Sequence, residues 1–167
     1  MTPAGRISLV LVRHAKSDWG VVREAHQPVI ADHDRPLNDR GRRDAPRMAR
    51  QLAETGFQPD AILSSTALRA RTTADAFAAE LGVPVTLDPE LYGAPARALL
   101  AAAAATRASS VLVVAHDPGM SVLAAHLSDG GIGHMPTCAV ASFTWEVGDW
   151  DVATALDPDD WTFDTPR

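Results

Sequence analysis

Six residues near the N-terminus, Leu9-Val10-Leu11-Val12-Arg13-His14, form an apolar run that ends in an Arg-His pair. A second apolar run, Val111-Leu112-Val113-Val114-Ala115-His116, also ends in a histidine. Short continuous apolar runs of this kind are typical of buried parallel strands. Because the carboxyl ends of parallel strands meet at one crevice of an open α/β sheet, we expect the two histidines to be neighbours in space.

Strand and helix signals alternate along the rest of the chain. We expect strands over residues 7–12, 60–64, 84–87, 110–115 and 138–145, and helices over residues 38–55, 67–81, 95–107 and 118–127. This alternation predicts an α/β fold: a three-layer sandwich in which a mostly parallel central sheet is flanked by helices.

Glycine and proline positions set the expected helix ends. Gly56 and Gly82 follow two of the helices, where glycine commonly stands. Asp117 and Pro118 are typical of an N-cap and a first helical residue, so the free N–H groups of that helix would lie near a bound anion. Pro46 falls inside the first helix, which therefore either kinks there or starts near it.

The length of 167 residues is that of about one domain. We assign residues 1–156 to a single domain and set residues 157–167 apart as an acidic C-terminal tail. The tail is expected to be partly disordered unless Trp161 and Phe163 anchor it. With 46% apolar and 22% charged residues, the composition is that of an ordinary soluble globular protein.

The net charge of −6 argues against a nucleic-acid partner held by phosphate contacts. No run approaches the ~18 apolar residues of a membrane helix, and the N-terminus lacks a signal-peptide pattern. The single cysteine, Cys138, fits a buried structural thiol in a reducing compartment, so we expect a cytoplasmic protein without a membrane partner. A cluster of arginines is open to two interpretations, a solvated helix face or a basic rim that attracts an acidic or phosphorylated partner; its members are Arg35, Arg40, Arg42, Arg43, Arg47 and Arg50.

A third segment completes a candidate site. Ser64-Ser65-Thr66-Ala67-Leu68-Arg69-Ala70 brings Arg69 to the start of the helix that follows another strand. Two arginines and two histidines around one point suit a phosphoryl dianion, because guanidinium forks match phosphate geometry. Their charge also lowers the pKa of a neighbouring imidazole from its usual ~6.5, which keeps one ring nitrogen free to attack phosphorus.

At these residues the chain resembles the histidine phosphatase (phosphoglycerate mutase-like) superfamily. The resemblance lies in Arg13-His14-Ala15, in the segment from Ser64 to Ala70, and in Ala115-His116. A fourth segment, Arg35-Pro36-Leu37-Asn38-Asp39-Arg40-Gly41, resembles the compact SixA-like branch, which is known for phosphohistidine phosphatases. The four segments occur in the family's order and span roughly residues 7 to 145.

The resemblance implies a role for each residue. His14 is the nucleophile that forms a phosphohistidine enzyme intermediate, which water then hydrolyses, and His116 stabilises the transferring group. The hydroxyl of Ser17 touches the phosphate, and Arg35 points toward the substrate unless it is merely exposed to solvent. Glu90 stands where other branches place their proton donor, a role that SixA-like members do not clearly need. The implied catalytic residues are therefore His14, Arg13, Arg69, His116 and Glu90, and the substrate-binding residues are Arg13, Ser17, Arg35, Arg69 and His116.

The resemblance favours a phosphatase for phosphohistidine in proteins that needs neither cofactor nor metal. A small-molecule phosphomonoesterase or mutase of the same superfamily is the main alternative. A metal-dependent phosphoesterase would use Asp32-His33-Asp34 and His116-Asp117, and a non-catalytic phospho-ligand binding protein is a more remote alternative. Residues expected to lie outside the catalysis are Arg71, His26, His126 and His134, and Lys16 is open between a rim charge and a site residue.

Overall fold

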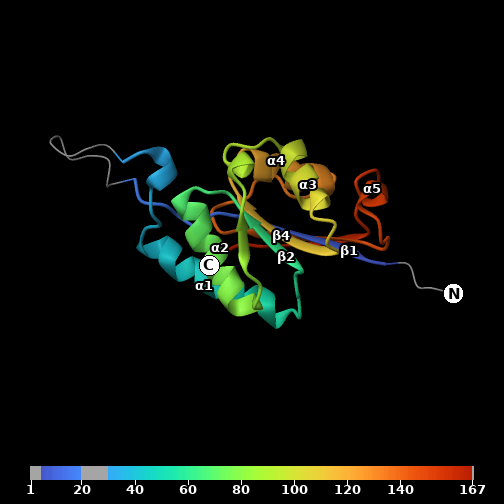
Figure 1. Cartoon of the computed structure of the whole chain (residues 1–167), viewed down its shortest axis with the longest axis horizontal. Coiled ribbons are helices and arrows are strands. Elements are labelled where there is room, and N and C mark those ends of the chain that lie inside the picture. The colour runs from blue at the N-terminus through green and yellow to red at the C-terminus, as the bar shows by residue number, and fades with distance from the viewer. Residues whose placement is uncertain (1–4, 20–29, 167) are drawn as a thin grey trace.

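The computed structural model describes residues 5–19 and 30–166. One mixed sheet of six strands, in the order β3-β2-β4-β1-β5-β6, runs through the described part of the molecule (Figure 1). The four strands from β3 to β1 are mutually parallel, whereas β5 runs antiparallel to β1 and β6 antiparallel to β5. The expected α/β fold with a mostly parallel central sheet is therefore confirmed.

The elements follow the expected order, with short additions. The strands are β1 (Ile7–Arg13), β2 (Ala61–Ser64), β3 (Val85–Leu87), β4 (Ser110–Ala115), β5 (Val140–Trp145) and β6 (Asp160–Asp164). The α-helices are α1 (Asp39–Glu54), α2 (Leu68–Leu81), α3 (Ala96–Ala105), α4 (Gly119–Leu127) and α5 (Trp150–Ala153). Two one-turn 3₁₀ helices, η2 (Asp32–Asp34) and η3 (Pro89–Leu91), were not expected from the sequence. Among the described residues, no helix is both long enough and apolar enough to cross a bilayer.

Two hydrophobic cores lie on opposite faces of the sheet. Successive side chains of a strand point to opposite faces, so Leu9 and Leu11 of β1 join the core under α3 and α4, whereas Val10 and Val12 join the core under α1 and α2. Figure 1 shows the two helix pairs on either side of the sheet. Burial on both faces explains why β1 and β4 read as continuous apolar runs rather than alternating ones.

The C-terminal segment contributes to the sheet. Residues 160–164 form β6, and Phe163 stands opposite Ala141 of β5 and contacts the hydrophobic core. Of the two alternatives left open for the tail, an aromatic anchor is the one that holds for these residues. Phe163 is the half-buried anchor, while Trp161 is 38% exposed.

Helices α1 and α4 begin within one residue of their expected starts, and their first turns decide two open points. Helix α1 begins at Asp39, with the side chain of Asn38 accepting the N–H of Gly41, so a start near Pro46 is wrong. Helix α4 begins at Gly119, and the carboxylate of Asp117 accepts the N–H of Ser121. A carboxylate therefore satisfies an N–H group of this helix that we expected to face a bound anion.

Candidate active site

His14 and His116 emerge side by side from the ends of two adjacent strands. Strands β1 and β4 are parallel and end opposite each other, at Arg13 and Ala115. The residue that follows each strand is a histidine. The backbone N–H of His14 donates to the carbonyl of Ala115 over 3.1 Å, and the two ring centroids lie 5.2 Å apart. Each residue is only 7% exposed. The expected proximity of the two histidines is confirmed.

The ring of His14 is held in one tautomer. Its Nδ1 lies 2.8 Å from the carbonyl oxygen of Ala15. Because a carbonyl can only accept, Nδ1 carries the proton and Nε2 keeps its lone pair. Burial lowers the pKa of His14 to about 3, and the neighbouring charges of His116, Arg69 and Arg13 act in the same direction. At neutral pH His14 is therefore an uncharged imidazole with a free Nε2, the form that a nucleophile requires.

His116 is held by the loop that follows β2. Its Nε2 lies 2.8 Å from the hydroxyl of Ser65, while Nδ1 is buried without a hydrogen-bond partner in the described part of the chain. Burial, followed by the charge of Arg69, lowers the pKa of His116 to about 4. His116 is therefore also neutral at neutral pH and acts by hydrogen bonding rather than by charge.

The guanidinium groups of Arg69, which is buried, and of Arg13, which is half-buried, flank the histidines. Nη1 of Arg69 donates to the carbonyl of Asp32 over 2.6 Å, and its Nη2 donates to the carboxylate of the same residue over 2.9 Å. Nη1 of Arg13 donates to the carbonyl of Met135 and lies 3.5 Å from the carboxylate of Asp117. Within residues 5–19 and 30–166, the Nε atoms of both arginines are buried and unpartnered. An oxyanion accepts hydrogen bonds from N–H groups of this kind.

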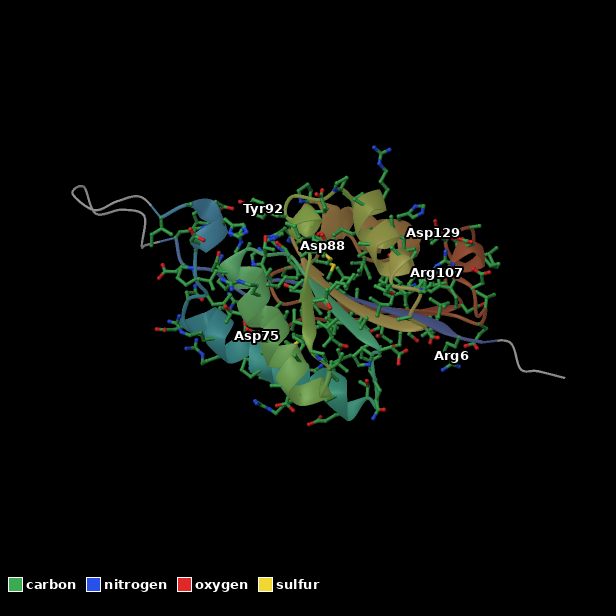
Figure 2. The ribbon with its side chains drawn as sticks, in the orientation of Figure 1. Arg6, Asp75, Asp88, Tyr92, Arg107 and Asp129 are labelled. Carbon is green, nitrogen blue, oxygen red and sulfur yellow. The ribbon has the colours of Figure 1, made fainter. Side chains whose placement is uncertain are left out.

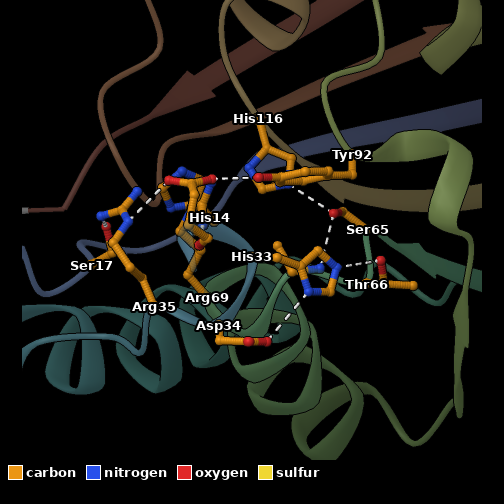
Figure 3. A network of polar contacts seen from close by, with 12 residues as sticks. His14, Ser17, His33, Asp34, Arg35, Ser65, Thr66, Arg69, Tyr92 and His116 are labelled. Carbon is orange, nitrogen blue, oxygen red and sulfur yellow. Dashed lines mark hydrogen bonds and ion pairs between the residues drawn. The ribbon is translucent and has the colours of Figure 1, made fainter. Parts of the chain in front are cut away.

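Arg35 and Ser17 form a second polar group at the mouth of the site (Figure 3). Nη1 of Arg35 donates to the Ser17 hydroxyl over 2.6 Å, and its Nε donates to the Asp32 carboxylate over 3.1 Å. The guanidinium carbon lies 3.4 Å from the centroid of the Trp19 ring, a cation–π contact. Since Arg35 is 4% exposed, the solvent-exposed alternative for this residue is wrong.

Asp32 joins these groups and was not assigned to the pocket by sequence reasoning. Its carboxylate accepts from Arg69, from Arg35 and, over 2.5 Å, from the hydroxyl of Tyr92. The Tyr92 hydrogen bond, followed by those of Arg69 and Arg35, holds the pKa of Asp32 well below its usual range. The same contact with Asp32 raises the pKa of Tyr92. Asp32 is thus a permanently ionised partner of the arginines.

Tyr92, two residues after Glu90, was also missed by sequence reasoning. The centroid of its ring lies 5.5 Å from that of His116 and 5.0 Å from that of His33, both in T-shaped contacts. Figure 2 shows Tyr92 beside η2, and Figure 3 shows it over the histidines. Glu90 is exposed, and within the described residues no hydrogen bond or ion pair joins its side chain to either histidine. The segment around Glu90 therefore reaches the pocket through Tyr92, the residue after η3, while the role of Glu90 stays a prediction.

The comparisons with known proteins agree with this geometry. Residues 9–93 match the family model described as Histidine phosphatase superfamily (branch 1). The chain belongs to the histidine phosphatase superfamily. An uncharacterised protein of Mycobacterium tuberculosis (strain H37Rv) is 38% identical over 68% of this chain and 67% of its own length. A chloroplastic protein of Arabidopsis thaliana, also uncharacterised, is 29% identical over 93% of this chain and 75% of its own length.

Solved structures place this histidine phosphatase beside the SixA-like branch. A candidate phosphohistidine phosphatase SixA from Nakamurella multipartitia superposes with a TM-score of 0.81 at 28% identity, over 99% of both chains. The protein histidine phosphatase SixA in complex with tungstate superposes with a TM-score of 0.69 at 26% identity, over 95% of both chains. The fold is therefore phosphoglycerate mutase-like, and the chain is a phosphatase of this superfamily.

The remaining candidate residues support the histidine phosphatase site indirectly or lie away from it. The carbonyl of Lys16 accepts the N–H of Asn38, and a Cβ on Gly41 would lie only 2.1 Å from that carbonyl oxygen, so glycine lets α1 approach the catalytic loop. Cys138 is buried, as expected, and its N–H donates to the carbonyls of Arg13 and His14. Burial raises the pKa of its thiol to about 12, which leaves it protonated and unreactive.

Four residues were predicted to have no part in catalysis, and the structure describes three of them. Arg71 and His126 are exposed, and the His134 ring lies at the edge of the site, 3.6 Å from the Asp117 carboxylate. His26 lies outside the described residues. Within the described residues, no group of three or more His, Cys, Asp or Glu side chains is placed to hold a metal ion.

Proposed function

We propose that this phosphatase hydrolyses phosphohistidine in proteins, with His14 as the nucleophile and Arg13, Arg69 and His116 around the transferring phosphoryl group. The observation that carries the proposal is the state of His14. Its Nε2 is unprotonated at neutral pH because Nδ1 donates to Ala15 and because burial opposes a second proton. The likeness to SixA structures at 26–28% identity, over 95–99% of this chain, supports the substrate class.

In the first step, the lone pair on Nε2 of His14 forms a bond to phosphorus. The bond from phosphorus to the substrate imidazole breaks, and its electron pair returns to that ring nitrogen. The guanidinium groups of Arg13 and Arg69 stabilise the charge on the equatorial oxygens, as fixed donors do in phosphoryl transfer. In the second step, the oxygen of water forms a bond to phosphorus, the bond from phosphorus to Nε2 of His14 breaks and its electron pair returns to Nε2, and the proton that water loses leaves with inorganic phosphate or to solvent. Because the arginines supply the positive charge, the proposed reaction requires no metal ion or other cofactor.

The proton requirement favours phosphohistidine over an alkyl phosphate. An alkoxide leaving group is strongly basic and needs a proton as its bond breaks, whereas phosphohistidine can be protonated beforehand and releases a weakly basic neutral imidazole. The carboxylic acid expected at Glu90 is exposed, and the group in contact with His116 is Tyr92, whose pKa is raised. The carboxyl group of Asp32 is held ionised by its hydrogen bonds and has no proton to give, which suits the phosphoramidate better than the ester.

The test compares His14→Ala with a matched control, His134→Ala, which removes an exposed imidazole at the edge of the site. The substrates are a phosphohistidine peptide, made with phosphoramidate, and an alkyl phosphate. The wild-type enzyme and the control should prefer the peptide, and His14→Ala should be inactive. Rapid quench should trap an acid-labile, base-stable phosphate on His14. Phosphate on a serine, full activity in His14→Ala, or a strong preference for sugar phosphates would refute the proposal.

A further inference from the structure

One face of helix α1 carries a row of exposed arginines that the catalytic site does not use. Arg40, Arg43, Arg47 and Arg50 are all exposed and follow one another at spacings of three, four and three residues. Residues spaced in this way lie on one side of a helix. At about 1.5 Å per residue, the row extends over about 15 Å. We refer to these four residues as the basic face.

The charge of the basic face is only partly balanced within the molecule. Asp44 lies 3.4 Å from both Arg40 and Arg47, and its side chain is only 8% exposed. Arg43 and Arg50 form no ion pair with any described residue. The face therefore carries a net charge of about +3, on a protein whose overall charge is −6.

The basic face borders a hollow and adjoins the catalytic loop. Its four arginines line a pocket of about 650 Å³ together with Asp44, Pro46 and Pro166. At its N-terminal end, α1 rests on the loop that carries the nucleophile, because the N–H of Asn38 donates to Lys16 and residue 37 pairs with residue 17. A partner that presents a phosphorylated side chain to His14 would therefore meet Arg40 first and the rest of the row beyond it.

We propose that the basic face is a docking surface for an acidic strip on the protein that carries the phosphoryl group, an inference that rests on the proposed function. Guanidinium groups pair with carboxylates in two-point hydrogen bonds, so arginine suits this role better than lysine. The matching strip carries carboxylates at helical spacing over about 15 Å, to one side of the phosphorylated residue. A single short row on an acidic protein suits a limited protein contact better than a nucleic acid, whose continuous phosphates would be repelled by the remaining surface.

The test uses two synthetic peptides with a central histidine, one with glutamates at i, i+3, i+7 and i+10 on one flank and one with glutamines there. Each is used both unphosphorylated and phosphorylated on the histidine. The test variant is Arg43→Glu/Arg50→Glu, chosen because these two arginines form no internal ion pairs. The control is Arg71→Glu/Arg97→Glu, which changes the net charge equally on other helices.

The wild type and the control should bind the unphosphorylated glutamate peptide about tenfold more tightly than the glutamine peptide, as expected for several individually weak exposed pairs. The test variant should lose this difference, together with its salt dependence, while hydrolysing a small phosphate ester at the wild-type rate. With the phosphorylated peptides, kcat/KM should follow the same pattern.

Equal binding of both peptides by the wild type, or an equal loss in the control, would overturn the docking proposal. Tighter binding of a single-stranded oligonucleotide than of the glutamate peptide would also overturn it, in favour of a nucleic-acid surface. If none of the phosphorylated peptides is hydrolysed, the proposed function fails instead. The binding measurement with unphosphorylated peptides still decides whether the basic face recognises acidic chains.

Discussion

Replacing His14 by asparagine should make the folded protein less sensitive to acid. The buried imidazole has its pKa lowered from 6.5 to about 3, chiefly because burial disfavours the charged ring. As the pH falls below 6.5, the unfolded chain takes up a proton at this residue and the folded chain does not, so the free energy of unfolding decreases. His14 therefore contributes full stability above about pH 6.5 and loses it progressively toward pH 3. Asparagine keeps a donor for the Ala15 carbonyl and does not titrate.

The size of the effect follows from the two pKa values. Between about pH 7 and pH 4.5, a shift from 6.5 to about 3 removes about 3 kcal/mol of unfolding free energy. His116, with a pKa of about 4, loses stability in the same range in both proteins, because its pKa is lowered by burial and by the charges of Arg69, His33 and Arg13, which His14→Asn leaves in place. The lowered pKa of Asp32 acts in the same direction, with a loss of stability as the pH falls below 3.8, but this loss lies outside that pH range. For a protein whose stability is of the usual 5–15 kcal/mol, about 3 kcal/mol is a large fraction.

The assay is urea unfolding of the wild type and of His14→Asn at about pH 7 and 4.5. With a typical urea dependence of about 2 kcal/mol per M, the midpoint of the wild type should fall by roughly 1–2 M more than that of the variant. His126→Asn, which removes an exposed imidazole of α4 outside the pocket, serves as the control and should follow the wild type. Equal losses in the wild type and in His14→Asn would refute the claim that His14 is buried in its neutral form.

Four further predictions concern catalysis. Arg69→Lys keeps the charge but loses the fork and should lower kcat/KM about 100-fold, whereas Arg71→Lys at an exposed position should be nearly silent; the reverse result would contradict our assignment of the buried fork to Arg69. Activity should survive excess chelator, and a loss that manganese or zinc restores would favour metal-dependent chemistry. Glu90→Gln should change hydrolysis of an alkyl phosphate and of a phosphohistidine peptide little, because the Glu90 side chain is exposed and, within the described residues, joins neither histidine; a loss of about 10²–10⁴-fold confined to the alkyl phosphate would instead make Glu90 the proton donor. Asp32→Asn should lower the inhibition constant of inorganic phosphate several-fold, because the Asp32 carboxylate competes with phosphate for the guanidinium group of Arg69. The exposed Asp34→Asn should leave this constant unchanged, and weaker phosphate binding in Asp32→Asn would instead make Asp32 a positioning group for Arg69.

The central part of the fold could be predicted from the sequence because burial leaves a strong pattern there. Strands β1 and β4 are covered on both faces and therefore consist almost entirely of apolar residues. The edge of the sheet leaves no such pattern. Strand β6 is mostly exposed and polar, and its pairing depends on backbone hydrogen bonds to β5. Helix α5 spans only four residues, too few for any helical periodicity.

The core of the site was predictable for a related reason. Arg13, His14 and His116 stand at or directly after strand ends, and Arg69 stands in the first turn of a helix, so the topology alone brings them together. Asp32 and Tyr92 belong to the 3₁₀ turn η2 and the residue after η3. Turns of three residues carry no periodicity, and their positions depend on tertiary contacts such as the hydrogen bond between Asp32 and Tyr92 themselves. Asp32 stands three residues before Arg35, a spacing that allows an ion pair. The same spacing is common between exposed charged residues, so it does not by itself indicate a functional site.

The charges around the histidines explain why carboxylates belong in a pocket for a phosphoryl dianion. In the proposed reaction His14 must be neutral to attack phosphorus, and burial beside the arginines keeps both histidines neutral. Those arginines need counter-charges when no substrate is bound, and Asp32 and Asp117 provide one for each. Each carboxylate leaves the Nε of its arginine unpartnered, so part of the guanidinium stays available to an oxyanion. Asp32, with its side chain 47% exposed, is the counter-charge that an arriving dianion can displace at least cost, which is why its neutralisation should strengthen phosphate binding.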